Sequence, residues 1–240
     1  MERVAHLFFD LGGTLVDLRG LVPSMTSQIL ARYPELDARA EAIAFSWSAR
    51  TAAATSRAVG PAFRSGFVLT GDALVAALAD AGIQADFDTA IALVKSATMD
   101  FVGDARLFAD VSPRLLRSLR SRVSSMGIVT DSVDFLVRAL MSNLHLHGLF
   151  DVVVISESMR TYKPDPRIYR AALEEACAEP QTSVFVSDSV VDLQGAARVG
   201  MGTAWIRRGS ESLRSEPPRQ TIIISSLGEL AEALAIKGSS

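Results

Sequence analysis

The chain has 240 residues; 49% are hydrophobic, 21% are charged, and the formal net charge is −3. This composition is typical of a folded globular protein and excludes both a disordered chain and the strongly basic surface of many nucleic-acid-binding proteins. No apolar run reaches the roughly 20 residues that span a membrane, so we expect neither a nucleic-acid nor a membrane partner.

The most informative segment lies near the N-terminus, where the largely apolar run 6–9 ends on Asp10. Such a run predicts a buried strand that carries a carboxylate at its end, and a carboxylate there can act as a nucleophile. Gly12 and Gly13 follow, and glycines let main-chain N–H groups approach an anion closely. We therefore expect Leu11 and Gly12 to contact the substrate.

Residues 17–104 differ in kind, because they show helical periodicities and almost no strand signal. Four helices are predicted from apolar positions at Leu21, Met25 and Ile29, at Ile43 and Trp47, at Leu74 and Leu78, and at Ile91, Val94 and Phe101. The segment is therefore expected to be a helical insertion, with connections to the rest of the chain near residues 16–17 and 103–104.

Three further apolar runs predict strands that lead into polar residues. The runs 126–129, 151–155 and 183–186 are followed by Thr130 and Asp131, by Lys163, and by Asp188 with Asp192 four positions later. Helical patterns follow these runs, and repeated strand–helix units indicate parallel strands whose ends lie on one edge of the sheet. One site can therefore collect Asp10, Thr130, Lys163 and Asp188.

Together these segments resemble the four signature motifs of the haloacid dehalogenase-like (HAD) hydrolase superfamily. The resemblance is carried by residues 10–14, Thr130, 163–166 and 188–192. It implies an α/β fold with a Rossmann-like core and a central parallel sheet, formed by residues 1–16 and 105–240. It also implies a C1-type helical cap over residues 17–104 that selects the substrate, and in most members Mg²⁺-dependent phosphoryl transfer through an aspartyl-phosphate.

The resemblance also assigns a metal site. Asp10, as nucleophile, would bind Mg²⁺ together with Asp188 and the main-chain carbonyl of Gly12, while Asp192 would orient a metal-bound water. A divalent cation is physically reasonable here, because a phosphate ester is anionic and repels a carboxylate nucleophile.

The same comparison with the family assigns the substrate contacts. Lys163 would supply fixed positive charge to the phosphoryl group and to Asp10, and the Thr130 hydroxyl and the Asp131 N–H would hold phosphate oxygens. The predicted function is that of a Mg²⁺-dependent phosphatase acting on a small phosphorylated metabolite.

One departure from the family pattern matters more than the matches. The family usually has a second Asp two residues after the nucleophile as general acid and base, and this chain has Gly12. General acid–base assistance is worth about 10²–10⁴ in rate. A phosphatase of this kind would therefore favour leaving groups that need little protonation, such as those of anomeric sugar, acyl or aryl phosphates.

Two alternatives stay open. A 2-haloacid dehalogenase expels halide, which needs no proton, and residues 185–187, Asp192, 195–196 and 205–206 resemble that branch. However, dehalogenases need no metal and usually carry Tyr at the position of Gly12 and a non-acidic residue at that of Asp188, so Asp188 discriminates between the two functions. In the third interpretation the chain has lost catalysis and binds a ligand or a protein partner.

The remaining expectations concern the compartment and assembly. Cys177 is the only cysteine, which excludes an intrachain disulfide and suits a reducing compartment. It is expected to be a small buried side chain within a helix. The N-terminus leads into the first strand without a signal-peptide pattern, so we expect a cytoplasmic protein. A monomer or homodimer is expected.

Overall fold

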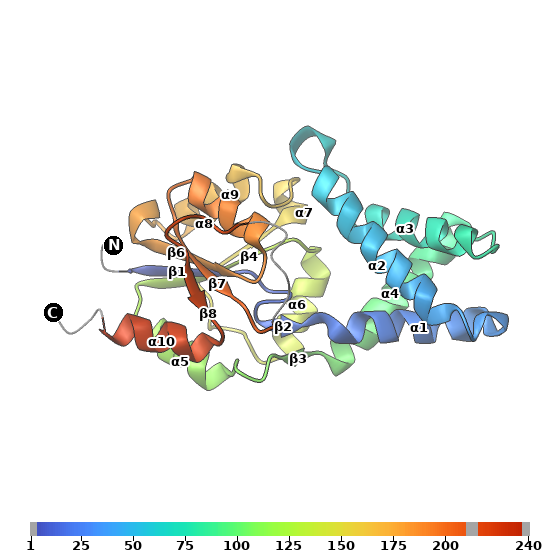
Figure 1. The fold of residues 1–240 in the computed structure, drawn as a ribbon, viewed down its shortest axis with the longest axis horizontal. Coiled ribbons are helices and arrows are strands. Elements are labelled where there is room, and N and C mark those ends of the chain that lie inside the picture. Colours follow the sequence, from blue (N-terminus) through green and yellow to red (C-terminus); the bar gives the residue numbers. More distant parts are fainter. Residues whose placement is uncertain (1–3, 210–215, 237–240) are drawn as a thin grey trace.

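The computed structural model describes residues 4–209 and 216–236. Its centre is a parallel sheet with strand order β5-β4-β1-β6-β7-β8 (Figure 1). The strands are β1 (His6–Phe9), β4 (Ser125–Thr130), β5 (Val152–Ile155), β6 (Ser183–Ser187), β7 (Gly202–Ile206) and β8 (Ile222–Ile224). The predicted α/β fold with a central parallel sheet is confirmed, although β7 had not been recognised in the sequence.

Strand β1 lies between β4 and β6 and is buried on both faces. Phe9 lies opposite Ile128 of β4 and Val186 of β6. Leu7 and Phe9 pack into one apolar cluster and Phe8 into another, as the two-residue period of a strand requires. The strand that carries Asp10 is therefore fixed from both sides.

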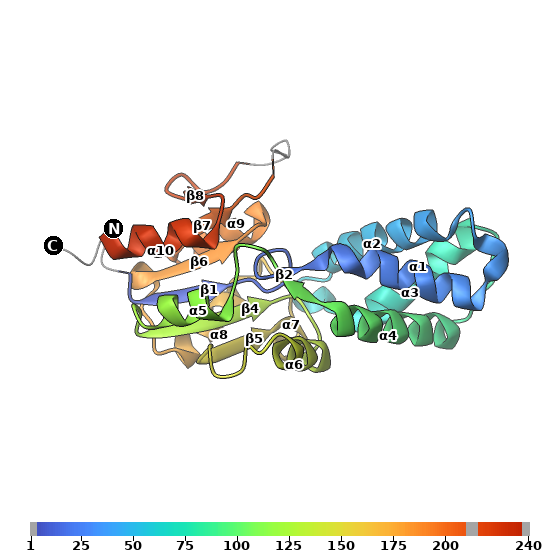
Figure 2. The same cartoon turned by 90° about the horizontal axis from the view of Figure 1, so that it is seen from below.

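Helices cover both faces of the sheet (Figure 2). On the face of Leu7 and Phe9 lie α5 (Pro113–Arg120), α6 (Asp134–Asn143) and α10 (Leu227–Ile236). On the face of Phe8 lie α8 (Pro166–Glu175) and α9 (Val190–Arg198), and α7 (Ser156–Met159) follows directly on β5. The result is a three-layer sandwich.

The sequence marks the beginnings of several of these helices. Asp165 caps α8 by accepting a hydrogen bond from the N–H of Arg167, and Pro166 occupies the first helical position. Ser189 caps α9 by accepting from the N–H of Asp192. Both helices therefore start directly after segments that carry predicted site residues.

The insertion forms a bundle of α1 (Leu21–Arg32), α2 (Ala40–Arg57), α3 (Gly66–Asp80) and α4 (Phe87–Asp104), which projects from the core (Figure 1). We call this bundle the cap. It has its own apolar cluster, which includes Met25, Ile29, Trp47, Leu74 and Leu78. A short antiparallel ribbon of β2 (Val16–Asp17) and β3 (Arg106–Leu107) joins it to the core. The division of the chain at residues 17 and 104 stays a prediction.

Within residues 4–209 and 216–236, none of the helices combines the length and apolar character needed to cross a membrane.

Candidate active site

The ends of neighbouring strands bring the predicted residues together. Asp10 directly follows β1, Thr130 ends β4 and Asp188 directly follows β6. Because β4 and β6 flank β1 in a parallel sheet, these three residues lie on one edge, as predicted. Lys163 comes from the segment between α7 and α8, which follows the edge strand β5.

An ammonium group lies at the centre of the site. The Nζ atom of Lys163 is 2.6 Å from an Asp10 carboxylate oxygen and 2.7 Å from one of Asp192. All three residues are buried, with exposed fractions of 6% for Lys163, 7% for Asp10 and 8% for Asp192. Lys163 therefore orients the Asp10 carboxylate directly, and Asp192 holds the ammonium from the other side.

The site holds more negative than positive charge. Four carboxylates, those of Asp10, Asp131, Asp188 and Asp192, act on the single ammonium of Lys163. Burial lowers the pKa of Lys163, but the surrounding carboxylates outweigh this effect and hold that pKa above its ordinary value. The lysine is therefore a permanent cation.

The same crowding affects the acids. Burial, reinforced by the charges of Asp192 and Asp188, raises the pKa of Asp10 to about 7 although Lys163 opposes the rise. Burial also raises the pKa of Asp131 to about 6. Two carboxyl groups in one small site therefore have pKa values close to neutral pH, and such raised values are typical of functional sites.

The turn after Asp10 is tightly closed. The N–H of Gly13 donates to the carbonyl of Val16 at 2.9 Å, and the N–H of Val16 donates to that of Leu11 at 2.8 Å. Gly13 has a φ of 80°, and a Cβ atom there would overlap the carboxylate of Asp188. Glycine is therefore required at position 13 both by the backbone and by the approach of Asp188.

Thr14 fastens this turn to the segment after β6. Its hydroxyl donates to Oδ1 of Asp188 at 3.2 Å and accepts from the N–H of Asp188 at 3.1 Å. On the other side, Nε1 of Trp205 donates to the carbonyl of Asp188 at 3.0 Å. Asp188 as a whole residue is exposed to solvent. The protein around its carboxylate nevertheless removes part of the water from it, and this desolvation raises the pKa of Asp188.

The donor atoms match the chemistry of a hard divalent cation. Asp10, Asp188 and the Gly12 carbonyl supply only oxygen ligands, and Mg²⁺ is commonly bound by one or two carboxylates with several waters. No three His, Cys, Asp or Glu side chains of the described residues form a metal-binding cluster. Asp192 pairs with Lys163, in keeping with an orienting role rather than direct ligation. The excess of carboxylates is a second feature that a cation would balance.

No acid stands at position 12, two residues after Asp10. A Cβ atom on Gly12 would lie 2.9 Å from Cδ1 of Leu18, so an apolar side chain occupies that space. The nearby Asp17 accepts hydrogen bonds from Arg19, which hold the pKa of Asp17 below its ordinary value. Asp17 is therefore an ionised residue that caps the short 3-10 helix after it, and not a replacement acid.

Predicted substrate contacts line the same edge. Thr130 is buried, and its hydroxyl makes no hydrogen bond within the described residues. Within that part of the chain, the N–H groups of Leu11 and Gly12 donate no main-chain hydrogen bond outside the sheet ladders. The carboxylate of Asp131, for which no role was predicted, accepts from the main-chain N–H of Lys163 at 3.0 Å. Their roles toward a substrate stay predictions.

Sequence reasoning missed a positioning element around Arg208. Its guanidinium donates to the carbonyls of Gly13 (3.1 Å) and Thr14 (2.9 Å) and pairs with Asp110 at 2.8 Å. Asp110 also accepts from the N–H of Leu227 at the start of α10. Arg208 follows the unpredicted strand β7, so no sequence signal pointed to it.

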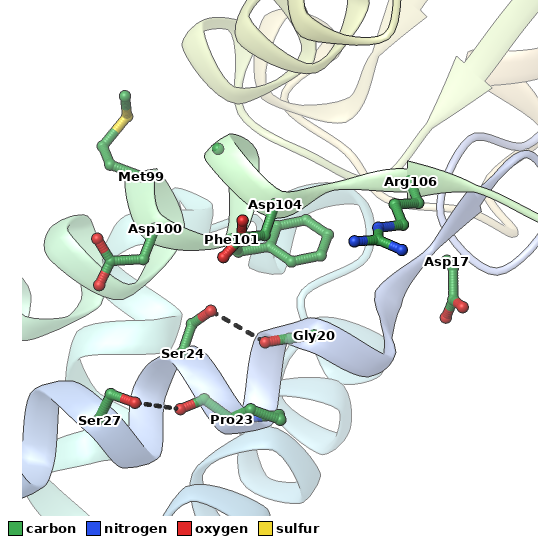
Figure 3. Close-up of a pocket in the computed structure, with 11 residues that line it drawn as sticks. Asp17, Gly20, Pro23, Ser24, Ser27, Met99, Asp100, Phe101, Asp104 and Arg106 are labelled. Carbon is green, nitrogen blue, oxygen red and sulfur yellow. Dashed lines mark hydrogen bonds between the residues drawn. The ribbon is translucent and has the colours of Figure 1, made fainter.

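A separate hollow of about 750 Å³ opens beside the connections to the cap (Figure 3). Residues of α1 line one side, and residues of α4 and β3 line the other. Its lining residues are Asp17, Gly20, Pro23, Ser24, Ser27, Met99, Asp100, Phe101, Gly103, Asp104 and Arg106. None of them is a predicted catalytic residue, so this hollow is distinct from the candidate site.

The geometry agrees with the family that the sequence itself identifies. The family model described as haloacid dehalogenase-like hydrolase matches residues 4–200, and the chain belongs to this family. It is therefore a hydrolase of the HAD family, which confirms the predicted resemblance.

Relatives differ in how much of the chain they match. The (S)-2-haloacid dehalogenase 4A of Burkholderia cepacia is 26% identical over 236 residues, which cover 98% of this chain and 96% of that protein. The haloacid dehalogenase-like hydrolase domain-containing protein 3 of Mus musculus is 37% identical over 50% of this chain and 48% of its own length. The glyceraldehyde 3-phosphate phosphatase of Methanopyrus kandleri is 36% identical over 42% of this chain and 44% of its own length. The last two matches thus span about half of each protein.

The fold matches over the whole length. The L-2-haloacid dehalogenase of Xanthobacter autotrophicus superimposes with a TM-score of 0.76 over 99% of this chain and 100% of that chain. The two sequences are 22% identical, so this likeness concerns the fold alone.

Proposed function

We propose that this chain is a hydrolase in which Asp10 attacks a carbon–halogen bond of a 2-haloacid. The proposal is carried by the environment of Gly12, where Leu18 fills the place of the usual second acid. A halide leaves without a proton, so this site suits it better than an alkoxide leaving group. Relatives that match over both core and cap also support this alternative over the phosphatase function predicted first.

The reaction would proceed in two steps. One Asp10 carboxylate oxygen attacks carbon 2 of the acid, the carbon–halogen bond breaks, and the halide departs with the bonding electrons. Water then attacks Cγ of the resulting Asp10 ester, and the 2-hydroxy acid is released as the carboxylate is restored. One proton is released to solvent over the cycle.

The surrounding residues would assist both steps. Lys163 holds the Asp10 carboxylate in a fixed orientation, and its positive charge favours the ionised form of that carboxylate. Asp192 lies next to the same ammonium, and in this proposal it would accept the proton of the hydrolytic water. The Thr130 hydroxyl and the N–H groups of Leu11 and Gly12 would bind the carboxylate of the acid.

A second candidate is the Mg²⁺-dependent phosphatase, and Asp188 is the observation that favours it. This acid lies against the turn after Asp10, and the site has one ammonium for four carboxylates. Asp10, Asp188 and the Gly12 carbonyl would hold Mg²⁺, with Asp192 orienting bound water. The ion would supply the positive charge that an anionic phosphate ester needs. Thr130, Lys163 and the Asp131 N–H would hold the phosphoryl oxygens of a small phosphorylated substrate.

One assay series separates the two. Halide release from (S)-2-chloropropionate in EDTA is compared with phosphate release from aryl, acyl and sugar phosphates in Mg²⁺, for wild type, Asp10→Asn and Asp188→Asn. A dehalogenase releases halide without metal, loses this activity in Asp10→Asn and retains it in Asp188→Asn. A phosphatase requires Mg²⁺ and loses activity in both variants.

A single turnover in ¹⁸O-labelled water adds an independent check. Hydrolysis through an Asp10 ester places the label in the Asp10 carboxylate, and mass spectrometry of the peptide containing Asp10 detects it. Label that appears only in the hydroxy acid contradicts the covalent route. Absence of turnover on every substrate favours the third interpretation, in which the chain has lost catalysis and binds a ligand or a protein partner.

A further inference from the structure

The cap touches the core beside the catalytic lysine. Three hydrogen bonds join main-chain atoms of the cap segment 60–66 to side chains of the core segment 157–162. They run from Gly60 N to Thr161 Oγ1 (3.0 Å), from Gly66 N to Glu157 Oε2 (3.2 Å) and from Tyr162 Oη to the carbonyl of Arg64 (2.9 Å). Each of these hydrogen bonds therefore forms only when the cap lies in this position against the core.

Aromatic packing reinforces this contact. The rings of Phe63 and Tyr162 have their centroids 5.2 Å apart, and the guanidinium of Arg160 lies 5.5 Å from the ring of Phe63. Tyr162 is 2% exposed and shares a small apolar cluster with Ala58 and Leu69 of the cap. The tyrosine is therefore buried by the cap and loses that cover if the cap moves away.

The same core segment carries the ammonium of the site. Tyr162 directly precedes Lys163, whose main-chain N–H donates to Asp131 and whose Nζ pairs with Asp10. On the far side, Asp165 accepts from the hydroxyl of Thr161 at 3.0 Å and caps α8. A few residues of main chain thus connect the cap contact to the nucleophile.

We propose that Tyr162 is a positioning residue that couples cap seating to the placement of Lys163. When the cap segment 60–66 is seated, Tyr162 is buried and hydrogen-bonded, and Lys163 points at Asp10. When the cap lifts, Tyr162 is uncovered, and the restraint on Lys163 weakens. The coupling rests on the proposed role of Asp10 as nucleophile beside Lys163, and it applies to either leaving group.

The test removes one hydroxyl. Tyr162→Phe keeps the ring and deletes the bond to the Arg64 carbonyl, and Tyr33→Phe is the matched control. Tyr33 lies in the cap, and its hydroxyl makes no hydrogen bond within the described residues. Hydrogen–deuterium exchange is followed in peptides that cover 58–67 and 157–165, and kcat and KM are measured on the substrate that wild type turns over.

We expect faster exchange in both segments of Tyr162→Phe, including the amide of Lys163, because that amide donates to Asp131 only while the segment is in place. Loss of one neutral hydrogen bond shifts such an equilibrium by about fivefold. The turnover number should therefore fall, by at most about fivefold, while KM changes less, since substrate still binds. Tyr33→Phe should match wild type in both measurements.

A second pair of variants guards against a folding defect. Thr161→Val removes both the acceptor for Gly60 N and the donor to Asp165 with little change of shape, whereas Thr161→Ser keeps both. The coupling predicts that Val reproduces the exchange and kcat effects of Tyr162→Phe and that Ser restores wild-type values.

The proposal is overturned if Tyr162→Phe speeds exchange only in 58–67 and leaves the Lys163 amide and kcat unchanged, because Tyr162 then only seats the cap. It is also overturned if Thr161→Ser is as impaired as Thr161→Val. If wild type turns over none of the substrates, the proposed function is refuted instead. The exchange rate of the Lys163 amide in Tyr162→Phe then still tests the coupling.

Discussion

At the residue scale, the candidate site is an acid-rich cluster around one cation. Lys163 neutralises part of the charge of Asp10 and Asp192, while Asp131 and Asp188 add to the excess. A buried carboxylate with too little compensating charge holds its proton to a higher pH. Asp10 is therefore predicted to be only partly ionised at neutral pH when no cation is bound.

The activity should rise with pH. Because the pKa of Asp10 is raised to about 7, halide release in EDTA should increase about tenfold per pH unit below that value and level off above it. Measurement of kcat/KM between pH 5 and 9 checks this. A flat profile over that range contradicts the assignment.

Stability should show the opposite slope. The folded state binds the Asp10 proton up to about pH 7, whereas an unfolded carboxyl releases it near its ordinary value of 3.8. The free energy of unfolding contributed by this group therefore falls as pH rises from about 4 to 7. Urea titrations at several pH values measure the free energy of unfolding. Between pH 4 and 7 this free energy should fall less, or rise more, with pH in Asp10→Asn than in wild type.

Gly12 offers a direct test of the missing acid. Its backbone has an ordinary φ, so a side chain is allowed there once Leu18 is shortened. If the site turns over phosphates, Gly12→Asp with Leu18→Ala should speed hydrolysis of an unactivated alkyl phosphate by at least about tenfold. Gly12→Asn with Leu18→Ala has the same shape without the acid, and an equal gain in that control would refute the explanation.

At the scale of elements, the segment after β7 secures the turn after β1. Arg208 holds the carbonyls of Gly13 and Thr14, and Asp110 holds Arg208. Thr14 in turn fixes Asp188. The geometry of the turn after Asp10 thus depends on a side chain that follows β7, far away in the sequence.

Arg208→Gln should therefore lower both stability and activity. Loss of these partly buried charged hydrogen bonds is expected to cost about 1–3 kcal/mol in free energy of unfolding. Denaturant titration measures this, and halide or phosphate release measures the activity. Arg19→Gln is the control, because Arg19 pairs with Asp17 at the exposed surface and should show no measurable loss.

The sequence predicted the elements whose signal is local. Strands β1, β4, β5 and β6 are apolar runs with polar ends, a pattern that lies within a few consecutive residues. Strand β7 was missed because its run of five residues lies close to glycines. Contacts between distant segments were also invisible, since periodicity within one helix carries no information about a partner.

Two side chains show this limit. Phe135 belongs to the apolar pattern of α6, yet it is 38% exposed and stacks on Phe67 of the cap with ring centroids 5.3 Å apart. Cys177 was expected to be buried, and this was wrong: α8 ends at Glu175, and Cys177 follows it with a φ of 48° and is exposed. Within the site, the pairing of Lys163 with both Asp10 and Asp192 required the folded structure.

At the scale of the whole molecule, core and cap have separate apolar clusters. Trp47 belongs to the cap cluster and Trp205 to a core cluster, and the chain has no other tryptophan. Each tryptophan therefore reports on one unit. The proposed division into core and cap predicts that the two units respond differently to local damage.

Leu74→Ala should weaken the cap selectively. Leu74 is fully buried there, and such truncations cost about 2–5 kcal/mol. In single-tryptophan variants, the unfolding transition reported by Trp47 should move to lower denaturant more than that reported by Trp205. Leu193→Ala, in the core cluster, should do the reverse. Equal shifts of both probes would show one cooperative unit instead.

The β2–β3 ribbon has a consequence for how this architecture can diversify. Val16 lies opposite Leu107, and Asp17 lies opposite Arg106, so the chain leaves and re-enters the core at adjacent points. Facing residues in an antiparallel pair are only about 5 Å apart, a gap that a two-residue hairpin turn can bridge. The ribbon is thus an insertion point. A helical bundle of another size, or a short turn alone, can connect β2 to β3 while β1 and β4 keep their register.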